Sequence, residues 1–326
     1  MPSAYSSQRI FITGGAGFIG SHIVDRLGQK RKEVIVFDNF SSGKLENIKQ
    51  WLKNSNFTLV REDLLKPASI LKPLSECETV FHLAANPEVR VGTADPKTHY
   101  KHNVTATFNL LEAVRKVGCV KNFVFTSSST VYGEAEKIPT PEDYAPLKPI
   151  SIYGASKLAS EALITAYAYT YGFNAIIYRL ANIIGPRAQH GVIHDFVNKL
   201  SRDSKKLEIL GDGTQRKSYL YIDDCIDAML MGVSHLHNRV EIYNVGSEDQ
   251  INVKEIADMV CQEMGLRNVE YIYTGGVDGG RGWKGDVKLM LLKIEKIKSL
   301  GWKPKLNSRQ AVRKTVKAIL HERKLI

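Results

Sequence analysis

Short apolar runs alternate with longer helical stretches through the first half of the chain. Six such runs stand out, at 10–12, 34–37, 57–60, 80–83, 123–125 and 175–178. Continuous apolar runs of this length are typical of strands buried on both faces of a parallel sheet, and parallel strands need a crossover connection such as a helix. The sequence therefore predicts an α/β fold with a doubly wound parallel sheet.

The pattern changes after Gly185, where the elements become shorter and glycine-rich turns appear. We expect a smaller C-terminal α/β domain over 181–218 and 246–326. The larger domain should span 1–180, joined by about 219–245, because that segment still contains strand-like runs. A chain of 326 residues is long enough for one large or two medium domains.

Two long helices are predicted in the larger domain. One, over 103–117, carries apolar residues at three- and four-residue spacing, and the other should run from about Ser151 to Tyr171. Both are candidates for packing, including packing between subunits. His82 lies beside an apolar run and is interpreted as a core histidine that is satisfied by hydrogen bonds.

A GxxGxxG pattern follows directly after the first apolar run. Glycines at a strand-to-helix turn permit a tight bend and close approach of a phosphate, and the following helix presents free N–H groups to an anion. Alone the pattern is weak, but its place in the first strand–turn–helix unit is typical of a Rossmann dinucleotide site. The residues expected to touch the dinucleotide here are Gly14, Gly17, Phe18, Ile19 and Gly20.

Asp38 ends the second apolar run. A carboxylate there accepts hydrogen bonds from the adenosine ribose and repels a 2′-phosphate, which favours NAD over NADP. Asp63, after the third run, is expected either to contact adenine or to act as a structural cap. Other residues beyond the strand ends complete the predicted NAD site: Asn39, Ser41, Ser42, Gly43, Leu64, Leu83, Ala84, Ala85, Asn103 and Ser127.

Tyr153 and Lys157 lie four residues apart in the second long helix, after the serine-rich stretch 126–130. Residues at this spacing share one helix face, so the ammonium can lie beside the phenol and favour its ionised form. Lowering a pKa by about three units corresponds to about 4 kcal/mol. Because the spacing is common on ordinary helix surfaces, only the nearby hydroxyls and the dinucleotide site make an acid–base role the better interpretation.

Composition argues against several other classes of partner. The net charge of +11 would suit an anionic partner, but the basic residues are spread along the chain without interleaved aromatics, so we expect no nucleic acid. The first eight residues are polar and no apolar run approaches the ~20 residues that cross a bilayer, which predicts a cytoplasmic protein without membrane contact. Four scattered cysteines lack ligand spacing, so we expect small buried side chains and no metal site.

Together these motifs resemble the extended short-chain dehydrogenase/reductase family, and within it the UDP-glucose (UDP-galactose) 4-epimerases. The resemblance covers nearly the whole chain through TGGAGFIGSH, FDNFSSG, FHLAAN, TSSSTVYG, YGASK, RLANIIGPR, GDGTQRKSYLYIDD, RGWKGDV and LGWKP. It implies an NAD-bound N-terminal domain, a C-terminal domain that binds a nucleotide-sugar, and a homodimer joined through the two long helices.

The resemblance also implies residue roles. Tyr153 would be the catalytic base, Lys157 would bind the nicotinamide ribose and lower the tyrosine pKa, and Ser128 would hydrogen-bond the sugar. In that chemistry C4 of the sugar is oxidised to a transient ketone, which turns over and is reduced from the opposite face. The other implied substrate contacts are Ser129, Asn182, Val192, Glu208, Ile209, Lys217 and Arg281.

Two departures from the family pattern concern the diphosphate. Lys217 stands at an arginine position of the GTQxRxxxY stretch, and Trp283 stands at the arginine position of the RxGD element, with Arg281 two residues earlier. Lysine lacks the fork of arginine but still binds a diphosphate as a point charge. We therefore expect Lys217 and Arg281 to contact it.

The pair Ser129-Thr130 separates related reactions. Dehydratases of the superfamily carry Asp-Glu at these positions, and the related decarboxylases typically carry glutamate at the second, whereas this chain has no carboxylate there. This favours an isomerase, a UDP-sugar 4-epimerase. A nucleotide-sugar dehydrogenase or reductase with exchangeable NAD and a non-catalytic dinucleotide sensor stay open, as does the choice between UDP-glucose or UDP-galactose and their N-acetyl analogues.

Overall fold

The structure is a computed structural model that describes residues 9–324, so the polar N-terminal octapeptide lies outside the described residues. The chain divides into two compact units. The first comprises the chain up to Ser128 with Ala155–Arg179 and Ile226–Tyr243, and the second comprises Ser129–Gly154, Leu180–Cys225 and the residues from Asn244 on. Residues 129–154, which the sequence assigns to the larger domain, thus group with the second unit.

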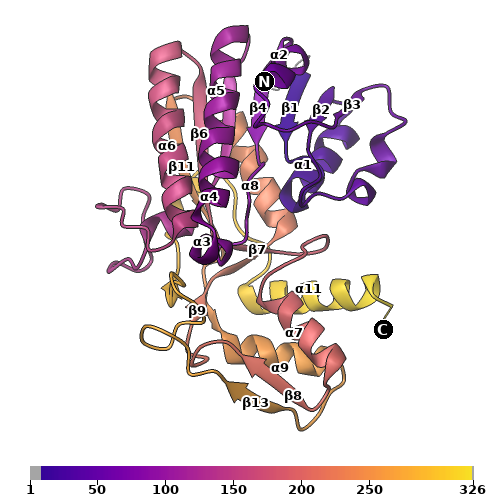
Figure 1. Ribbon diagram of the computed structural model, residues 1–326, viewed down its shortest axis with the longest axis vertical. Coiled ribbons are helices and arrows are strands. Elements are labelled where there is room, and N and C mark those ends of the chain that lie inside the picture. The colour runs from indigo at the N-terminus through magenta and orange to yellow at the C-terminus, as the bar shows by residue number, and fades with distance from the viewer. Residues whose placement is uncertain (1–8, 325–326) are drawn as a thin grey trace. The chain divides into compact units, whose positions relative to one another are not determined.

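The first unit is built on a seven-stranded sheet with the order β11-β6-β5-β4-β1-β2-β3 (Figure 1). Neighbouring strands from β3 to β5 pair in parallel. Each predicted apolar run lies in or overlaps one of the strands, which confirms the doubly wound α/β fold. The strands are β1 (Arg9–Thr13), β2 (Val34–Phe37), β3 (Phe57–Val60), β4 (Cys77–His82), β5 (Asn122–Ser128), β6 (Asn174–Leu180) and β11 (Val240–Val245).

Helices flank this sheet. The longer ones are α1 (Phe18–Gln29), α2 (Ala68–Leu74), α5 (Ala106–Val117), α6 (Ile152–Tyr171) and α8 (Ile222–Ser234). Figure 1 shows α5 and α6 standing side by side, and the Tyr167 hydroxyl donates to Glu112 between them at 2.8 Å. Apolar residues of α2, α5 and α6 share one buried core with the sheet. Short helices α3 (Val91–Ala94), α4 (Pro96–His99), η1 (Leu45–Asn47) and η2 (Lys49–Trp51) lie in the connections.

The helix predicted over 103–117 begins earlier and starts differently. A π-helical stretch, η3 (Tyr100–Thr105), precedes α5. The Asn103 carbonyl accepts the Thr107 hydroxyl at 2.6 Å and the Ser160 hydroxyl at 3.3 Å. Side-chain hydroxyls that bond a helix carbonyl compete with the regular ladder, which accounts for the wider turn.

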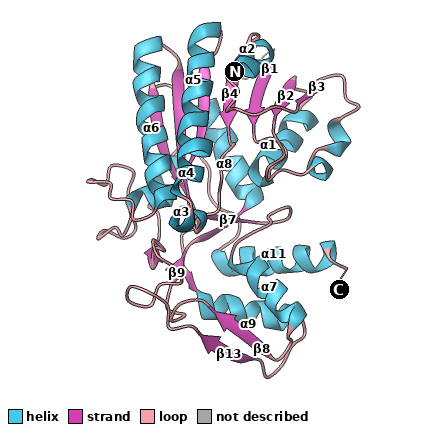
Figure 2. Ribbon diagram, in the orientation of Figure 1, coloured by secondary structure: helices cyan, strands magenta, loops and turns pink. Residues whose placement is uncertain are grey.

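The second unit consists of small sheets and helices (Figure 2). In the small sheets β7 (Asn182–Ile184) pairs with β10 (Tyr219–Tyr221), β8 (Lys206–Ile209) pairs with β13 (Glu270–Tyr273), and β9 (Arg216–Lys217) lies between β12 (Ile251–Asn252) and β14 (Leu289–Met290). The helical elements are η4 (Ser129–Tyr132), α7 (Val192–Arg202), α9 (Val253–Glu263), α10 (Glu295–Lys298) and α11 (Ser308–Glu322). Helices α7, α9 and α11 bury their apolar faces in one common core, which contains the side chain of Ile209. Asn252 and Asn307 begin α9 and α11 with capping boxes.

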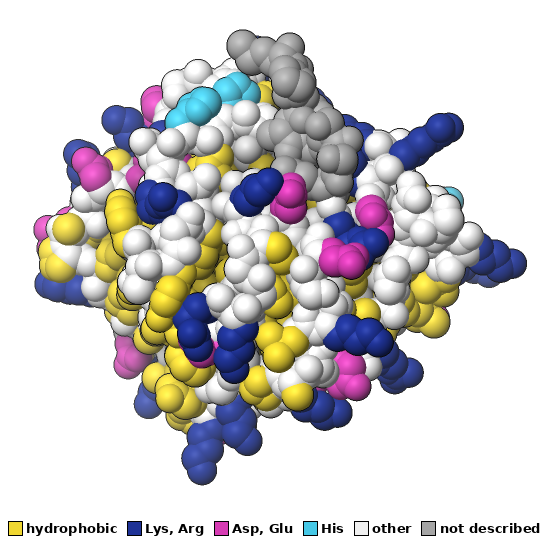
Figure 3. Space-filling view, turned by 90° about the horizontal axis from the view of Figure 1, so that it is seen from above, with side chains coloured by type: hydrophobic (Ala, Val, Ile, Leu, Met, Phe, Trp, Pro, Cys, Tyr) yellow, Lys and Arg dark blue, Asp and Glu magenta, His cyan; other side chains and the backbone are white. Residues whose placement is uncertain are grey.

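No helix within residues 9–324 is long and apolar enough to cross a bilayer. On the face shown in Figure 3, lysine and arginine side chains are scattered among acidic and apolar ones. The four cysteines are free thiols, of which Cys119 is partly exposed and the other three are buried.

His82 is the core histidine that the sequence suggests. One ring nitrogen lies 2.8 Å from the Thr13 hydroxyl and the other 2.8 Å from the Thr107 hydroxyl. Complete burial, with a smaller contribution from the nearby Lys157 charge, lowers the pKa of His82 to about 3. The ring is therefore neutral throughout the physiological range.

We expect this histidine to make the fold sensitive to acid. As the pH falls below about 6.5, the unfolded chain protonates His82 while the folded chain does not until pH about 3, so stability is lost between these values. His82→Gln should flatten the pH dependence of the unfolding free energy by up to about 1 kcal/mol per pH unit between pH 6 and 4. Urea titrations at each pH measure it, with exposed His321→Gln as control. Equal slopes in the wild type and His82→Gln would contradict the assignment.

Candidate functional site

The glycine loop between β1 and α1 is packed too closely for side chains. Gly14 has φ of 69°, and a Cβ added there would lie 2.7 Å from the backbone nitrogen of Ala84. A Cβ on Gly20 would lie 2.1 Å from the Gly14 carbonyl oxygen. Gly17 precedes α1 and offers no side-chain cap, which leaves the first N–H groups of the helix to a ligand. The loop has the form that a pyrophosphate requires.

Asp38 fastens the loop after β2 to the glycine loop. Its carboxylate accepts the Ala16 amide at 2.9 Å and the Phe40 amide at 2.8 Å. Burial raises the pKa of Asp38, and these two amides act in the opposite direction. Because a carboxylate accepts about four hydrogen bonds, it retains capacity for the two ribose hydroxyls. The site thus fits the adenosine half of NAD.

Asp63 caps the loop after β3, which is one of the two roles that the sequence leaves open for it. It accepts the Leu65 amide at 2.8 Å and the Asn39 side-chain amide at 3.0 Å. Burial alone would raise the pKa of Asp63, but these hydrogen bonds outweigh burial and lower it. Asn39 in turn accepts the Ser41 amide at 2.9 Å. The loops after β2 and β3 are therefore held together.

The remaining predicted cofactor residues lie on loops, in η3 and at the start of α1. At the end of β4, the amides of Leu83 and Ala84 both donate to the Thr13 hydroxyl at 3.2 Å. The side-chain nitrogen of Asn103 donates to the Ser156 hydroxyl at 2.9 Å, and its side-chain oxygen accepts the Asn86 backbone amide at 2.9 Å. The Asn103 side chain therefore joins these two segments. Phe18 and Ile19 begin α1, Ser42 and Gly43 follow Asp38, and Leu64 and Ala85 follow β3 and β4.

Lys157 is buried against the end of β5. The residue is 3% exposed, and its ammonium donates to the Thr126 carbonyl at 2.8 Å. Burial lowers the pKa of Lys157 to about 7, and the charge of Glu161 acts in the opposite direction. Tyr153 lies one turn earlier on α6, on the same helix face.

The first turn of α6 packs directly against η4. A Cβ on Gly154 would lie 2.7 Å from the Thr130 carbonyl oxygen, so glycine beside Tyr153 is what permits this approach. The Ser151 hydroxyl accepts the Gly154 amide at 3.0 Å and caps the turn. The turn that carries Tyr153 therefore lies against η4, which begins at Ser129, one of the predicted sugar contacts.

Ser127 differs from its prediction in one respect. The residue is 3% exposed. Its hydroxyl donates to Glu161, whose carboxylate also pairs with Arg179. The side chain therefore serves the interior, and the contact of Ser127 with NAD stays a prediction. The sequence does not predict the pairing of Glu161 with Arg179, because Glu161 lies on a helix and Arg179 on a strand.

Two polar side chains of the second unit have features of a ligand site. The Asn182 amide nitrogen is buried and has no hydrogen-bond partner among the described residues, and orphaned buried donors of this kind are rare. Lys217 is 17% exposed at its side chain and pairs with Asp286, with an ammonium-to-carboxylate distance of 2.5 Å. Its ammonium also lies 5.4 Å from the centre of the Trp283 ring. A bound ligand with a hydrogen-bond acceptor could satisfy the Asn182 amide.

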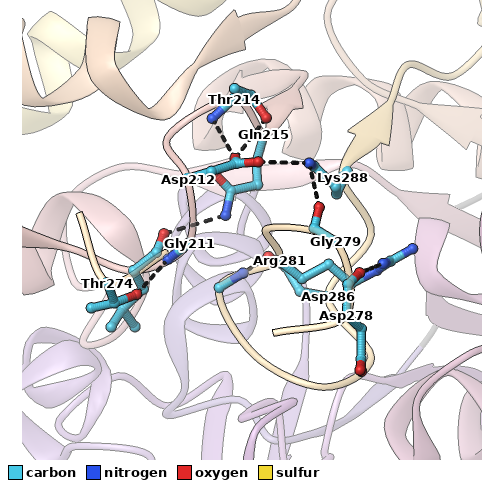
Figure 4. Close-up of polar contacts among 12 residues, drawn as sticks. Gly211, Asp212, Thr214, Gln215, Thr274, Asp278, Gly279, Arg281, Asp286 and Lys288 are labelled. Carbon is cyan, nitrogen blue, oxygen red and sulfur yellow. Dashed lines mark hydrogen bonds and ion pairs between the residues drawn. The ribbon is translucent and has the colours of Figure 1, made fainter. Parts of the chain in front are cut away.

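Arg281 belongs to a glycine-rich loop that is fastened to the turn around Asp212 (Figure 4). Lys288 donates to Asp212 at 2.9 Å and to the Gly279 carbonyl at 2.7 Å. Arg281 pairs with Glu134 and also donates to the Asp278 carbonyl. Each cation predicted to hold the diphosphate thus has a carboxylate partner in this structure.

Three of the implied substrate contacts differ in how far they are buried. Val192 begins α7 and is partly buried. Glu208 is exposed and accepts Lys199 at 3.1 Å. The Ile209 side chain is fully buried in the core of the second unit and its carbonyl accepts the Thr274 amide at 3.1 Å. Ile209 therefore presents no side chain to a ligand.

Comparison with known proteins agrees with these features. Residues 10–246 match the model of the NAD dependent epimerase/dehydratase family. A Methanocaldococcus jannaschii protein provisionally named UDP-glucose 4-epimerase is 35% identical over 94% of this chain and 97% of its own. A crystal structure of a UDP-galactose 4-epimerase has 43% identity and a TM-score of 0.84 over 96% of this chain and 99% of its own.

Other relatives are named for a different reaction or a different sugar. UDP-glucuronic acid decarboxylase 3 of Arabidopsis thaliana is 31% identical over 94% of this chain and 87% of its own. UDP-glucuronic acid 4-epimerase of Bacillus cereus, solved with UDP-glucuronic acid and NAD, has 30% identity and a TM-score of 0.87 over 96% and 99% of the two chains. The chain is therefore an enzyme of the NAD-dependent epimerase/dehydratase family, and its cofactor is NAD.

Proposed function

We propose that this enzyme inverts C4 of a UDP-sugar, with Tyr153 as the acid–base residue. The observation that carries the proposal is the buried ammonium of Lys157, one helical turn after Tyr153 on α6. The turn that carries Tyr153 packs against η4, where neither Ser129 nor Thr130 carries a carboxylate. A cation at this distance favours the phenolate, which makes tyrosine a usable base near neutral pH.

The chain's own residues would divide the work between orientation and proton transfer. Ser128 and Ser129 would hydrogen-bond the sugar and orient its 4-hydroxyl toward Tyr153, which accepts the proton as the alcohol becomes a ketone and returns it afterwards. NAD, when bound, supplies the reversible removal and return of hydride at C4. Lys157 would stabilise the phenolate throughout, so the same residue takes and gives back one proton.

The residues beside Ser128 disfavour the reactions of other relatives. Elimination of water needs an additional acid and base, and neither Ser129 nor Thr130 provides one at neutral pH. The first turn of α6 lies against these residues through Gly154, so a carboxylate at either position would be close to the reacting sugar. Its absence supports epimerisation over dehydration and decarboxylation.

We further propose that the first unit binds NAD and that the second unit binds the nucleotide-sugar through Asn182 and Lys217. A homodimer formed through α5 and α6 is supported by exposed aromatic residues there, of which Phe108 is 44% and Tyr169 is 68% exposed. The cytoplasmic location stays a prediction.

NMR of the sugar protons tests the reaction. The purified protein is incubated with UDP-glucose, UDP-N-acetylglucosamine or UDP-glucuronic acid, first without and then with added NAD. We expect the matching C4 epimer and no net reduction of NAD. Accumulating NADH would indicate a dehydrogenase, loss of carbon dioxide a decarboxylase, and a 6-deoxy-4-keto product a dehydratase, and each of these results would replace the proposal.

Lys217→Ala should weaken substrate binding without changing the chemistry. Loss of one cation from a diphosphate site costs about 1.5–3 kcal/mol, so we expect KM to rise by about 10- to 100-fold and kcat to change only a few-fold. Steady-state kinetics measures both. Lys298→Ala is the matched control, because Lys298 pairs with an exposed carboxylate, Glu248, of the same unit. An unchanged KM in Lys217→Ala would remove Lys217 from the site.

A further inference from the structure

A buried polar cluster formed by Ser127, Glu161 and Arg179 has no part in the proton and hydride transfers. The three residues are 3%, 4% and 3% exposed, respectively. Charged side chains are almost never this buried unless they are paired, and a buried ion pair often contributes little to stability. The position of this one calls for another explanation.

The contacts within the cluster use both oxygens of the carboxylate. Nε of Arg179 lies 3.1 Å from Oε1 and 3.2 Å from Oε2 of Glu161, and the terminal nitrogen Nη2 lies 2.8 Å from Oε2. The Ser127 hydroxyl donates to Oε1. Arginine forks hold a carboxylate in one orientation. Glu161 is therefore rigidly placed between β5 and β6.

This carboxylate lies one helical turn after Lys157. The Lys157 ammonium donates to the Thr126 carbonyl, and the Glu161 carboxylate accepts the hydroxyl of the next residue, Ser127. Two side chains of α6 thus bind two successive residues of β5. The residue that follows them is Ser128, at the end of the strand. These two contacts fix the position of the strand end that carries Ser128 along the helix that carries Tyr153.

The charges around Lys157 come from several elements. Glu161 on α6 carries the carboxylate whose charge favours its ammonium, and Arg179 on β6 partly offsets that charge. His82 on β4 is neutral, because burial keeps its pKa at about 3, and burial also lowers the pKa of His99 on α4. Tyr153 lies one turn before Lys157 in the sequence of α6. Glu161 is thus placed to oppose the effect of burial on Lys157.

We propose that Glu161 is a positioning residue for the acid–base centre: it clamps the end of β5 to α6 and supplies negative charge that favours the ammonium form of Lys157. Its importance for catalysis rests on the function proposed above. The charge is a property of the folded protein and can be measured without turnover.

The charge is tested by NMR titration of protein labelled with [ε-13C]lysine and saturated with NAD. The Lys157 signal is the one that disappears in Lys157→Met. Glu161→Gln leaves Arg179 uncompensated, so we expect the Lys157 midpoint to fall by about one pH unit or more. Glu161→Gln/Arg179→Gln removes both charges and should recover at least half of that shift. A midpoint that stays at the wild-type value in Glu161→Gln overturns the electrostatic role.

The clamp is tested with Ser127→Ala, which keeps both charges. We expect an unchanged Lys157 midpoint but a kcat lowered by about tenfold, because small displacements in an active site are costly. Wild-type kcat in this variant would overturn the clamp. If Glu161→Gln fails to fold, Glu161→Gln/Arg179→Gln still tests the charge effect. This double variant removes both charges of the pair, so it should lower the Lys157 midpoint by less than is expected for Glu161→Gln. If no sugar is epimerised by the wild type, the proposed function fails while the titration still tests the charge.

Discussion

Replacing Tyr153 with phenylalanine is expected to lower the rate of C4 epimerisation by about 10³-fold or more while NAD remains bound. A positioned acid–base residue contributes about 10²–10⁴-fold, and phenylalanine lacks the hydroxyl that carries the proton. The ring itself is retained, so its packing changes little. Single-turnover kinetics with a UDP-sugar and the absorbance of bound cofactor measure the two effects separately.

Tyr169→Phe provides the matched control for this experiment. Tyr169 lies on the same helix, α6, but is 68% exposed, so the loss of its hydroxyl should leave the rate unchanged. A Tyr153→Phe variant that retained a tenth or more of the wild-type rate would place the base at another residue. Loss of NAD from Tyr153→Phe would show instead that the variant disturbs the cofactor site.

Lys157→Met is expected to abolish most activity without destabilising the fold at neutral pH. The wild-type protein buries an ammonium whose pKa falls from the ordinary 10.5 to about 7, mainly because of burial, so the charge opposes folding. Methionine fills a similar volume without charge but removes the hydrogen bond to the Thr126 carbonyl, at a cost of about 1–3 kcal/mol. The rate should fall by about 10²-fold or more, because the phenolate loses its neighbouring cation.

The pH dependence of stability identifies the buried ammonium directly. Between pH about 7 and 10.5 the unfolded chain holds the proton that folded Lys157 releases, so wild-type stability should rise with pH by up to about 1 kcal/mol per unit relative to Lys157→Met. Below pH 7 the difference should be constant. Urea unfolding at several pH values measures it, with exposed Lys116→Met as control. Parallel curves for the wild type and Lys157→Met would show that this ammonium is not buried.

Much of the fold could be predicted from local sequence. Buried parallel strands are continuous apolar runs, which is why the runs at 34–37 and 57–60 coincide with β2 and β3. The glycine pattern predicts the turn before α1 because only residues without Cβ fit the backbone there, as the approach of Gly14 to Ala84 shows. The π-helical start at Tyr100 was not predicted, because it depends on hydroxyls from Thr107 and from Ser160 on another helix.

The candidate site could be predicted only in part. The spacing of Tyr153 and Lys157 is local, so their shared helix face follows from the sequence. Pairings such as Lys217 with Asp286 and Arg281 with Glu134 join residues far apart in the chain, and no local pattern indicates them. The same holds for Ile209, whose position in an apolar core depends on helices contributed by later segments.

By itself, the sequence determined the doubly wound sheet, the glycine turn, the choice of NAD and the tyrosine–lysine pair. These features depend on backbone geometry and residue spacing over a few positions, which any short stretch of chain encodes. Only the tertiary structure decided that Lys157 is buried, that Thr126 and Ser127 are held by α6, and that Arg179 neutralises Glu161. Burial and charge pairing depend on residues brought together from distant parts of the chain, and these surroundings set the pKa values on which the chemistry depends.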